Sequence, residues 1–250
     1  MKTNLLIGSK SFYANVFKVA VPIIIQGTID NLISILDNIM ISVLGTKHMV
    51  AVSISNQVLL LPFFCFLGIT VGAGVLGSQY FGKRDYDNFR NILRIKILFV
   101  LIIYFLMHIL LYFYGSDIVV LYLKYGNNAI QDNEDILTYA HEYLRYSLWG
   151  QIPLALSFCY STTLRETFHT TIPMKASLVA LSINFVFNYI FINGNFGFPA
   201  LGITGAAIGT IIARSCDVLI MISWIHINRS QVPYMCNLFK NISISFCRRK

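Results

Sequence analysis

Two carboxylates lie within the first long apolar stretch of this chain. Asp37 sits near its end, and Asp30 precedes it by seven residues. A carboxylate at membrane depth costs a few kcal/mol at least, so it usually faces a polar cavity and marks an ion or proton pathway. Residues seven apart on a helix differ by only about 20° in direction, which places the two acids on one face, roughly 10 Å apart along the axis. Together they predict ion transport.

Three amide side chains fall at a depth similar to that of Asp37. Counted from the outer end of each predicted helix, Asp37, Gln57, Asn184 and Asn188 lie about 6 to 12 Å deep, at about 1.5 Å per residue. Asn184 and Asn188 are four residues apart and so share one helix face, where their amides can orient a carboxylate or ligate a cation such as Na⁺ through oxygen. The alternative is interhelical hydrogen bonding that only holds a bundle together.

The composition places these side chains in a bilayer. Of the 250 residues, 56% are hydrophobic and only 12% are charged, whereas about a quarter of the residues of an average soluble domain are charged. Each of six apolar stretches reaches the roughly 20 residues that cross a hydrocarbon core as helix. The sequence therefore predicts an all-α bundle of six transmembrane helices, over Val19–Leu44, Val50–Leu76, Ile95–Tyr114, Tyr143–Leu164, Ile172–Ile192 and Ile203–Ile227.

Basic residues alternate between the predicted connections. They gather before the first helix, around the second and fourth connections and after the sixth helix, and the group around the second connection includes Lys83 and Lys96. The third connection is acidic. Under the positive-inside rule this pattern predicts a cell-membrane protein with both termini in the cytoplasm. The net charge of +8 therefore reflects membrane topology and does not predict a nucleic-acid partner.

Other motifs favour structure over catalysis. Gly72, Gly74 and Gly77 spell G-x-G-x-x-G, but no strand precedes them, so we expect close helix packing and no dinucleotide site. Arg214 and Asp217 are three residues apart near the middle of the sixth stretch, which predicts a mutually neutralising pair. No metalloprotease motif, phosphate-binding loop or cluster of Cys and His ligands occurs in the sequence. We therefore expect neither an enzyme, nor a bound metal centre, nor an organic cofactor.

Several short segments, in this order and spacing, resemble the N-terminal half of the multidrug and toxic compound extrusion (MATE) family of transporters. The similarity covers about 200 residues, although each fragment is weakly specific alone. The fragments are Val21-Pro22, Leu36 to Met40, Gly68 to Asp85, Leu164-Arg165 with Pro173, and Gly194 to Arg214 with the two asparagines before it.

The resemblance implies a twelve-helix transporter whose two six-helix lobes rock around the substrate. It implies that Asp37 binds a proton or Na⁺, assisted by Asn184 and Asn188, and that residues 1–227 form one lobe. Residues 228–250 would then be a basic cytoplasmic tail or the start of a connector. Asp30 lies outside the family pattern, and we assign it a secondary role in tuning Asp37.

The sequence thus predicts a cation-coupled antiporter that exports amphipathic or cationic compounds. We expect a truncated half whose partner is a missing C-terminal lobe, although a homodimer could rebuild two lobes. The alternatives are a flippase for lipid-linked oligosaccharides, which should line its cavity with Arg or Lys, and a non-transporting scaffold subunit, whose buried acids would pair with a neighbouring chain.

Overall fold

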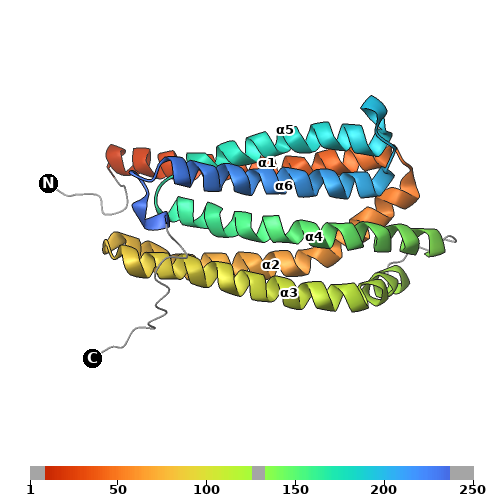
Figure 1. Ribbon diagram of the computed structural model, residues 1–250, viewed down its shortest axis with the longest axis horizontal. Coiled ribbons are helices and arrows are strands. Elements are labelled where there is room, and N and C mark those ends of the chain that lie inside the picture. Colours follow the sequence, from red (N-terminus) through yellow and green to blue (C-terminus); the bar gives the residue numbers. More distant parts are fainter. Residues whose placement is uncertain (1–8, 126–132, 237–250) are drawn as a thin grey trace.

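The computed structural model describes residues 9–125 and 133–236 of the chain. Within these ranges it contains six long helices, nearly parallel or antiparallel to one another (Figure 1). Two short 3₁₀ turns, η1 and η2, accompany them. The helices are α1 (Lys10–Ser42), α2 (Thr46–Gly82), α3 (Tyr86–Tyr125), α4 (Asn133–Glu166), α5 (Thr171–Asn193) and α6 (Gly202–Ile227), and the turns are η1 (Asn195–Gly197) and η2 (Pro233–Met235).

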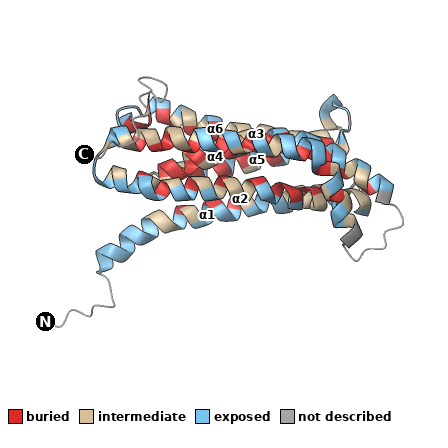
Figure 2. Ribbon diagram, turned by 90° about the horizontal axis from the view of Figure 1, so that it is seen from below, coloured by how far each residue is buried: buried red, intermediate tan, exposed pale blue. Residues whose placement is uncertain are grey.

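The helices form two groups with α4 between them. In Figure 1, α1, α5 and α6 lie on one side, α2 and α3 on the other, and α4 packs against both α6 and α2. Residues on the helix faces that meet at the centre of the bundle are buried, and those on the outward faces are exposed (Figure 2). Many exposed side chains are large and apolar, such as Phe105, Ile109 and Phe113 on α3, as expected for a surface that faces lipid.

Five of the six helices are long and apolar enough to cross a membrane, and α4 is the exception in the described part of the chain. The sequence analysis predicted six apolar spans, so for α4 the apolarity was overestimated. Its 34 residues are enough to cross the hydrocarbon core, but Gln151, Ser157 and Ser161 lie buried along it. The reason is its position, because a helix enclosed by others presents less surface to lipid.

Local signals explain where several helices begin and end. Ser9 caps α1, since its hydroxyl accepts a hydrogen bond from the backbone N–H of Phe12 at 3.2 Å. Asp85 does the same before α3, accepting from the N–H of Asn88 at 3.2 Å. Gly194 ends α5 with a φ of 71°, and a Cβ there would lie 2.6 Å from the backbone nitrogen of Ala200. Only glycine fits this turn, which reverses the chain into α6.

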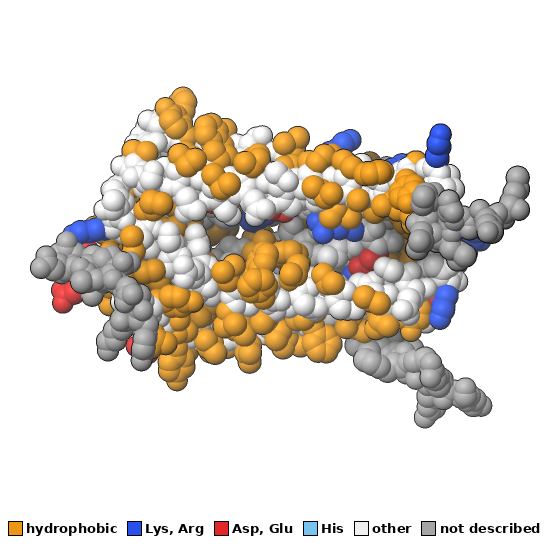
Figure 3. All heavy atoms as spheres, turned by 180° about the vertical axis from the view of Figure 1, so that it is seen from behind, with side chains coloured by type: hydrophobic (Ala, Val, Ile, Leu, Met, Phe, Trp, Pro, Cys, Tyr) orange, Lys and Arg blue, Asp and Glu red, His pale blue; other side chains and the backbone are white. Residues whose placement is uncertain are grey.

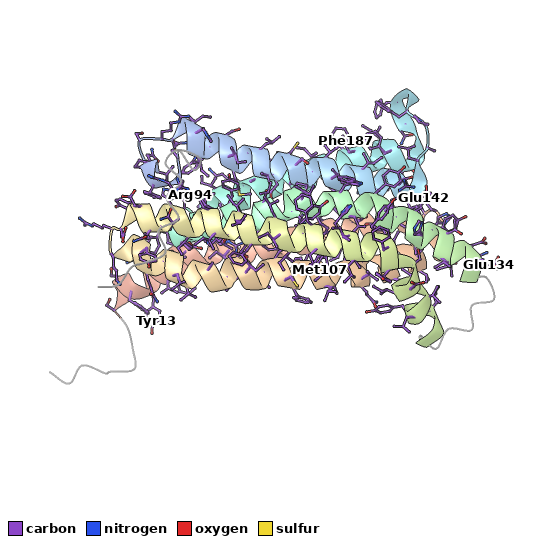
Figure 4. All side chains as sticks on the ribbon, turned by 60° about the horizontal axis from the view of Figure 1, so that its bottom comes forward. Tyr13, Arg94, Met107, Glu134, Glu142 and Phe187 are labelled. Atoms are coloured by element: carbon purple, nitrogen blue, oxygen red, sulfur yellow. The ribbon has the colours of Figure 1, made fainter. Side chains whose placement is uncertain are left out.

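The two ends of the bundle differ in charge. We call the end where α1 begins and α6 ends the terminal end, and the other the distal end. Figure 4 shows Arg94 toward the terminal end and Glu134 and Glu142 toward the distal end. The basic residues of the α2–α3 connection, among them Lys83, also belong to the terminal end.

The segment after α6 folds back onto the bundle. Tyr234 of η2 is buried, and its ring lies 5.2 Å from that of Tyr86, 5.3 Å from that of Phe81 and 5.5 Å from that of Phe89. The turn η2 is therefore packed against α2 and α3. The rest of the predicted basic tail, residues 237–250, lies outside the described residues.

Candidate functional site

Close packing of α5 on α6 positions the polar side chains nearest to Asp37. A Cβ on Gly205 would lie 2.7 Å from the backbone of Phe191, and one on Gly209 would lie 2.1 Å from Oδ1 of Asn188. These two glycines let α6 approach α5, as the small residues of membrane helices commonly do. Asn188 therefore projects directly against α6, and its amide reaches α1.

Four side chains from α1, α5 and α6 form a closed ring of hydrogen bonds, which we call the Asp37 ring. Asn188 Nδ2 donates to Asp37 Oδ1 at 2.5 Å and to Asn184 Oδ1 at 3.3 Å. Asn184 Nδ2 donates to Thr210 Oγ1 at 3.2 Å, and the Thr210 hydroxyl donates to Asp37 Oδ2 at 3.3 Å. Each Asp37 oxygen thus accepts one hydrogen bond from a neutral donor. Both asparagines are fully buried.

The structure brings together three of the residues that the sequence singled out, Asp37, Asn184 and Asn188. It does not place Gln57 with them, because that side chain is exposed and makes no hydrogen bond within the described part of the chain. Its neighbour Asn56 accepts a 3.5 Å hydrogen bond from the hydroxyl of Tyr143. Axial depth alone misplaced Gln57, since it ignores the direction in which a side chain points.

Thr210 and Tyr143 also belong to this region, although neither stands out in the sequence. Tyr143 of α4 is buried near Asp37 and packs in a cluster with Ile41 and Ile192. The only signal for Thr210 was its spacing of four residues before Arg214, which puts both on one face of α6. A threonine in an apolar helix is too common to have been singled out on that ground.

Arg214 does not pair with Asp217, so that prediction was wrong. Its Nη1 donates to Asp30 Oδ1 at 2.8 Å, and Asp217 instead accepts a hydrogen bond from the Ser157 hydroxyl at 2.5 Å. Side chains three apart on one helix can both face a neighbouring helix, where each finds a partner of its own. Asp30 and Asp37 do share one face of α1, as predicted, but the guanidinium of Arg214 neutralises Asp30.

A second polar cluster joins α1, α4 and α5 nearer the terminal end. Arg165 Nη2 donates to Gln26 Oε1 at 2.7 Å. Gln26 Nε2 in turn donates to Ser161 at 3.3 Å and to Ser177 at 3.2 Å. Figure 3 shows a hollow along one face of the bundle that contains Lys or Arg and Asp or Glu side chains between hydrophobic margins.

The predicted packing role of the G-x-G-x-x-G segment fails for Gly72, whereas Gly74 and Gly77 do lie against side chains of neighbouring helices. A Cβ on Gly74 or Gly77 would lie 2.7 or 2.3 Å from a carboxylate oxygen of Glu166, whereas Gly72 has nothing within 4 Å. These glycines make room for a side chain, not for a neighbouring helix backbone. Glu166 forms a buried ion pair with Lys96, whose Nζ also donates to Thr163 Oγ1 at 3.3 Å. Lys96, expected beside a connection, is therefore completely buried.

The described residues contain no group of three or more His, Cys, Asp or Glu side chains that could hold a metal ion. The carboxylate, amide and hydroxyl oxygens of the Asp37 ring are the kind of ligand that Na⁺ prefers, and the Asp37 carboxylate is the one group in the ring that can bind a proton. A single carboxylate is the only charge in the ring, and the Asn188 amide presents its nitrogen to that carboxylate.

Comparison with known proteins identifies the class. The MatE family profile matches residues 22–190, most of the chain, and the protein belongs to that family. Members of this family are transporters, not enzymes, so the protein is a multi-pass membrane protein of a transporter family.

Individual relatives cover the chain but extend beyond it. The "Probable multidrug resistance protein NorM" of Agrobacterium fabrum is 22% identical over 198 residues, 79% of this chain and 41% of its own length. "Multidrug resistance protein MdtK" of Pectobacterium atrosepticum is 28% identical over 196 residues, 76% of this chain and 40% of its own. The chain thus spans about two fifths of the length of these curated relatives.

Solved structures share the fold. A structure described as "MATE in the straight conformation" aligns with a TM-score of 0.76 at 22% identity, over 94% of this chain and 48% of that one. The outward-facing conformation of a multidrug resistance MATE family transporter aligns with a TM-score of 0.72 at 22% identity, over 86% and 45%. The six-helix bundle predicted from sequence is therefore confirmed as the fold, equivalent to about half of such a transporter.

Proposed function

We propose that this chain is the N-terminal lobe of a cation-coupled antiporter that exports amphipathic or cationic small molecules, and that Asp37 binds the coupling ion. The observation that carries the proposal is the Asp37 ring, in which a carboxylate within a transmembrane helix is held only by neutral donors from two other helices. The multidrug names of the relatives support the substrate class.

The ring offers a direct way to couple ion binding to helix position. When Asp37 is ionised, it accepts from both Asn188 and Thr210 and so ties α1 to α5 and α6. A proton on Asp37 turns one acceptor into a donor, and the hydrogen bond to that oxygen must reverse or break. Na⁺ would instead recruit carboxylate, amide and hydroxyl oxygens, after rotation of the amides that now present nitrogen to Asp37. Either ion weakens the present tie between α1 and its neighbours.

Export requires a second lobe, because one bundle provides only half of the walls of a pathway between two lobes. The length of the relatives supports a C-terminal lobe as the partner, and a second copy of this chain is the alternative. The concentration of basic residues at the terminal end, which includes Lys83 and Arg94, supports cytoplasmic termini in the cell membrane.

The alternative of a lipid-linked oligosaccharide flippase gains little support from the guanidinium groups. Arg214 is paired with Asp30, and Arg165 is bound to the amide oxygen of Gln26. Neither is thus presented as a free clamp for a pyrophosphate. A scaffold subunit would pair its buried acids with a partner chain, whereas the donors to Asp37 all come from this lobe.

The test compares Asp37→Asn with Asp117→Asn, a matched control on the exposed surface of α3. The purified chain in lipid nanodiscs is titrated with an organic cation such as ethidium, with H⁺ release and bound ²²Na⁺ measured in parallel. We expect unaltered chain to release H⁺ or Na⁺ on binding, Asp37→Asn to lose the release completely, and Asp117→Asn to retain it. The amide is nearly isosteric, so the amount of folded protein should not change.

A parallel measurement in a drug-sensitive host tests assembly. Expression together with the C-terminal lobe of a relative should confer resistance that Asp37→Asn abolishes, and expression of the chain alone should not. Full resistance with Asp37→Asn, at equal protein level, would remove Asp37 from the coupling site. Resistance from the chain alone would favour the homodimer.

A further inference from the structure

A row of polar side chains continues from the Asp37 ring along α6 toward the terminal end. Thr210, Arg214 and Asp217 are spaced by four and three residues and so lie on one face of the helix. Each is hydrogen-bonded to a side chain of another helix, respectively Asp37, Asp30 and Ser157. We call these six residues the polar seam. Of these six residues, the proposed coupling mechanism uses only Thr210 and Asp37.

Of the three acids in the polar seam, Asp217 has the carboxylate that is least stabilised by hydrogen bonds and opposite charge. It is only 1% exposed, its Oδ2 accepts one hydrogen bond from the Ser157 hydroxyl, and its Oδ1 is buried with no hydrogen-bond partner in the described part of the chain. Asp30, by contrast, has a guanidinium 2.8 Å away. An ionised carboxylate so deeply buried, with one neutral hydrogen-bond donor, carries a large desolvation cost that a single such hydrogen bond does not offset.

The surrounding charges do not remove that cost. Two charged groups lie near Asp217, the guanidinium of Arg214 and the carboxylate of Asp30. These two are paired with each other, so their effects on Asp217 largely cancel. The α4 face contributes Ser157, and the next charge along α4, Arg165, is bound to Gln26.

The net charge of the region points in the same direction. The polar seam holds three carboxylates, from Asp30, Asp37 and Asp217, and the guanidinium of Arg214. Even with the nearby Arg165 included, whose charge interacts with Asp30, the region carries one excess negative charge when every acid is ionised. A single proton makes it neutral, and a neutral interior is much cheaper in a low-dielectric medium.

We propose that Asp217 is a proton-binding site of the lobe, distinct from the Asp37 ring, and that it carries a proton at neutral pH. It lies seven residues from Thr210 on α6, about 10 Å along the axis, on the side of the terminal end. A proton held there is one step along the polar seam from Asp37. Use of that proton in coupling rests on the proposed function, whereas its presence on Asp217 does not.

Infrared spectroscopy of the purified chain in nanodiscs tests the site without any transport, because a protonated carboxyl group has a C=O stretch well separated from the amide bands. We expect a band in that region at neutral pH that moves in D₂O, is lost in Asp217→Asn, and persists in Asp37→Asn and in the exposed control Asp117→Asn. An unchanged spectrum for Asp217→Asn would overturn the proposal.

A second variant covers the case in which Asp217→Asn does not fold. Ser157→Ala removes only the hydroxyl that donates to Asp217, so a protonated Asp217 should show its C=O band shifted to higher frequency. No shift in a folded Ser157→Ala chain would mean that Asp217 is ionised. If Asp37→Asn leaves ion release intact while the Asp217 band is present, the proposed coupling function fails and this proton site stands.

Discussion

The Asp37 ring and the Lys96–Glu166 pair are two buried polar sites of one bundle that hold their charge in opposite ways. Glu166 has an ammonium partner, and the absent side chains of Gly74 and Gly77 make space for its carboxylate. Asp37 has only the amide of Asn188 and the hydroxyl of Thr210. A carboxylate that is paired with a buried opposite charge is already neutralised and does not need a bound ion. A carboxylate that accepts hydrogen bonds only from neutral donors can instead be neutralised by binding a proton or Na⁺. This contrast separates a structural site from the coupling site that we propose.

The largest effect that we expect is a loss of stability when the Lys96–Glu166 pair is broken. Lys96→Met leaves Glu166 buried without its counter-charge, and we expect a loss of about 3 to 5 kcal/mol in the free energy of unfolding. The double change Lys96→Met with Glu166→Met should recover most of it, because the unpaired charge is then gone. Thermal unfolding in detergent, followed by circular dichroism, measures both.

The matched control for that prediction is Lys47→Met. Lys47 also forms an ion pair, with Asp135 at 2.8 Å, but its side chain is 40% exposed and that of Asp135 57%. An exposed pair of this kind contributes less than about 1 kcal/mol. If the two lysine variants lose equal stability, or the double change is no better than Lys96→Met, the pair does not lock the charge of Glu166.

A middle-sized effect concerns the space beside Glu166. Gly77→Ala puts a methyl group against the carboxylate, and we expect a loss of about 1 to 3 kcal/mol, typical of overpacking. Gly72→Ala, on the same helix with nothing within 4 Å of the new atom, should be neutral or gain up to about 1 kcal/mol from better helix propensity. The same unfolding measurement ranks the two, and equal stabilities would show that the glycines do not serve Glu166.

The sequence was informative where the signal is local. Apolar length predicted the helices, and the four-residue spacing of Asn184 and Asn188 correctly put both on the face that meets Asp37. An intramembrane carboxylate stands out against apolar neighbours because few such residues occur there without a role. The helical bundle and the three central residues of the site were therefore accessible from residue types and spacing.

Long-range pairing was not accessible in the same way. Lys96 and Glu166 are 70 residues apart, and each lies near the edge of an apolar stretch where a charge ordinarily meets water. The sequence allows Arg214 to pair with Asp217 on its own helix or with an acid on α1. The packing of α1 against α6 determines that the partner is Asp30. Gln57 failed for a related reason, since depth along a helix does not reveal its rotation.

The smallest effect is a change with pH in the cost of removing a threonine hydroxyl, compared between one threonine at each site. Thr163 Oγ1 accepts from the ammonium of Lys96, and the Thr210 hydroxyl donates to Asp37. A hydrogen bond to a charged group contributes about 1.5 to 3 kcal/mol and one between neutral groups about 1 kcal/mol. The cost of Thr163→Val should change little with pH, because the Thr163 hydroxyl accepts from the ammonium of Lys96 and makes no hydrogen bond to a carboxylate in the described part of the chain.

The cost of Thr210→Val should instead depend on pH. At high pH Asp37 is ionised, so Thr210→Val removes a hydrogen bond to a charged group, which costs about 1.5 to 3 kcal/mol. At low pH Asp37 gains a proton, the lost hydrogen bond is between neutral groups, and the cost falls to about 1 kcal/mol. Thr210→Ser, which keeps the hydroxyl, serves as the control and should show no such dependence. Parallel unfolding curves across pH provide the measurement, and a constant cost for Thr210→Val would mean that Asp37 does not change its charge, which removes the distinction between the two sites.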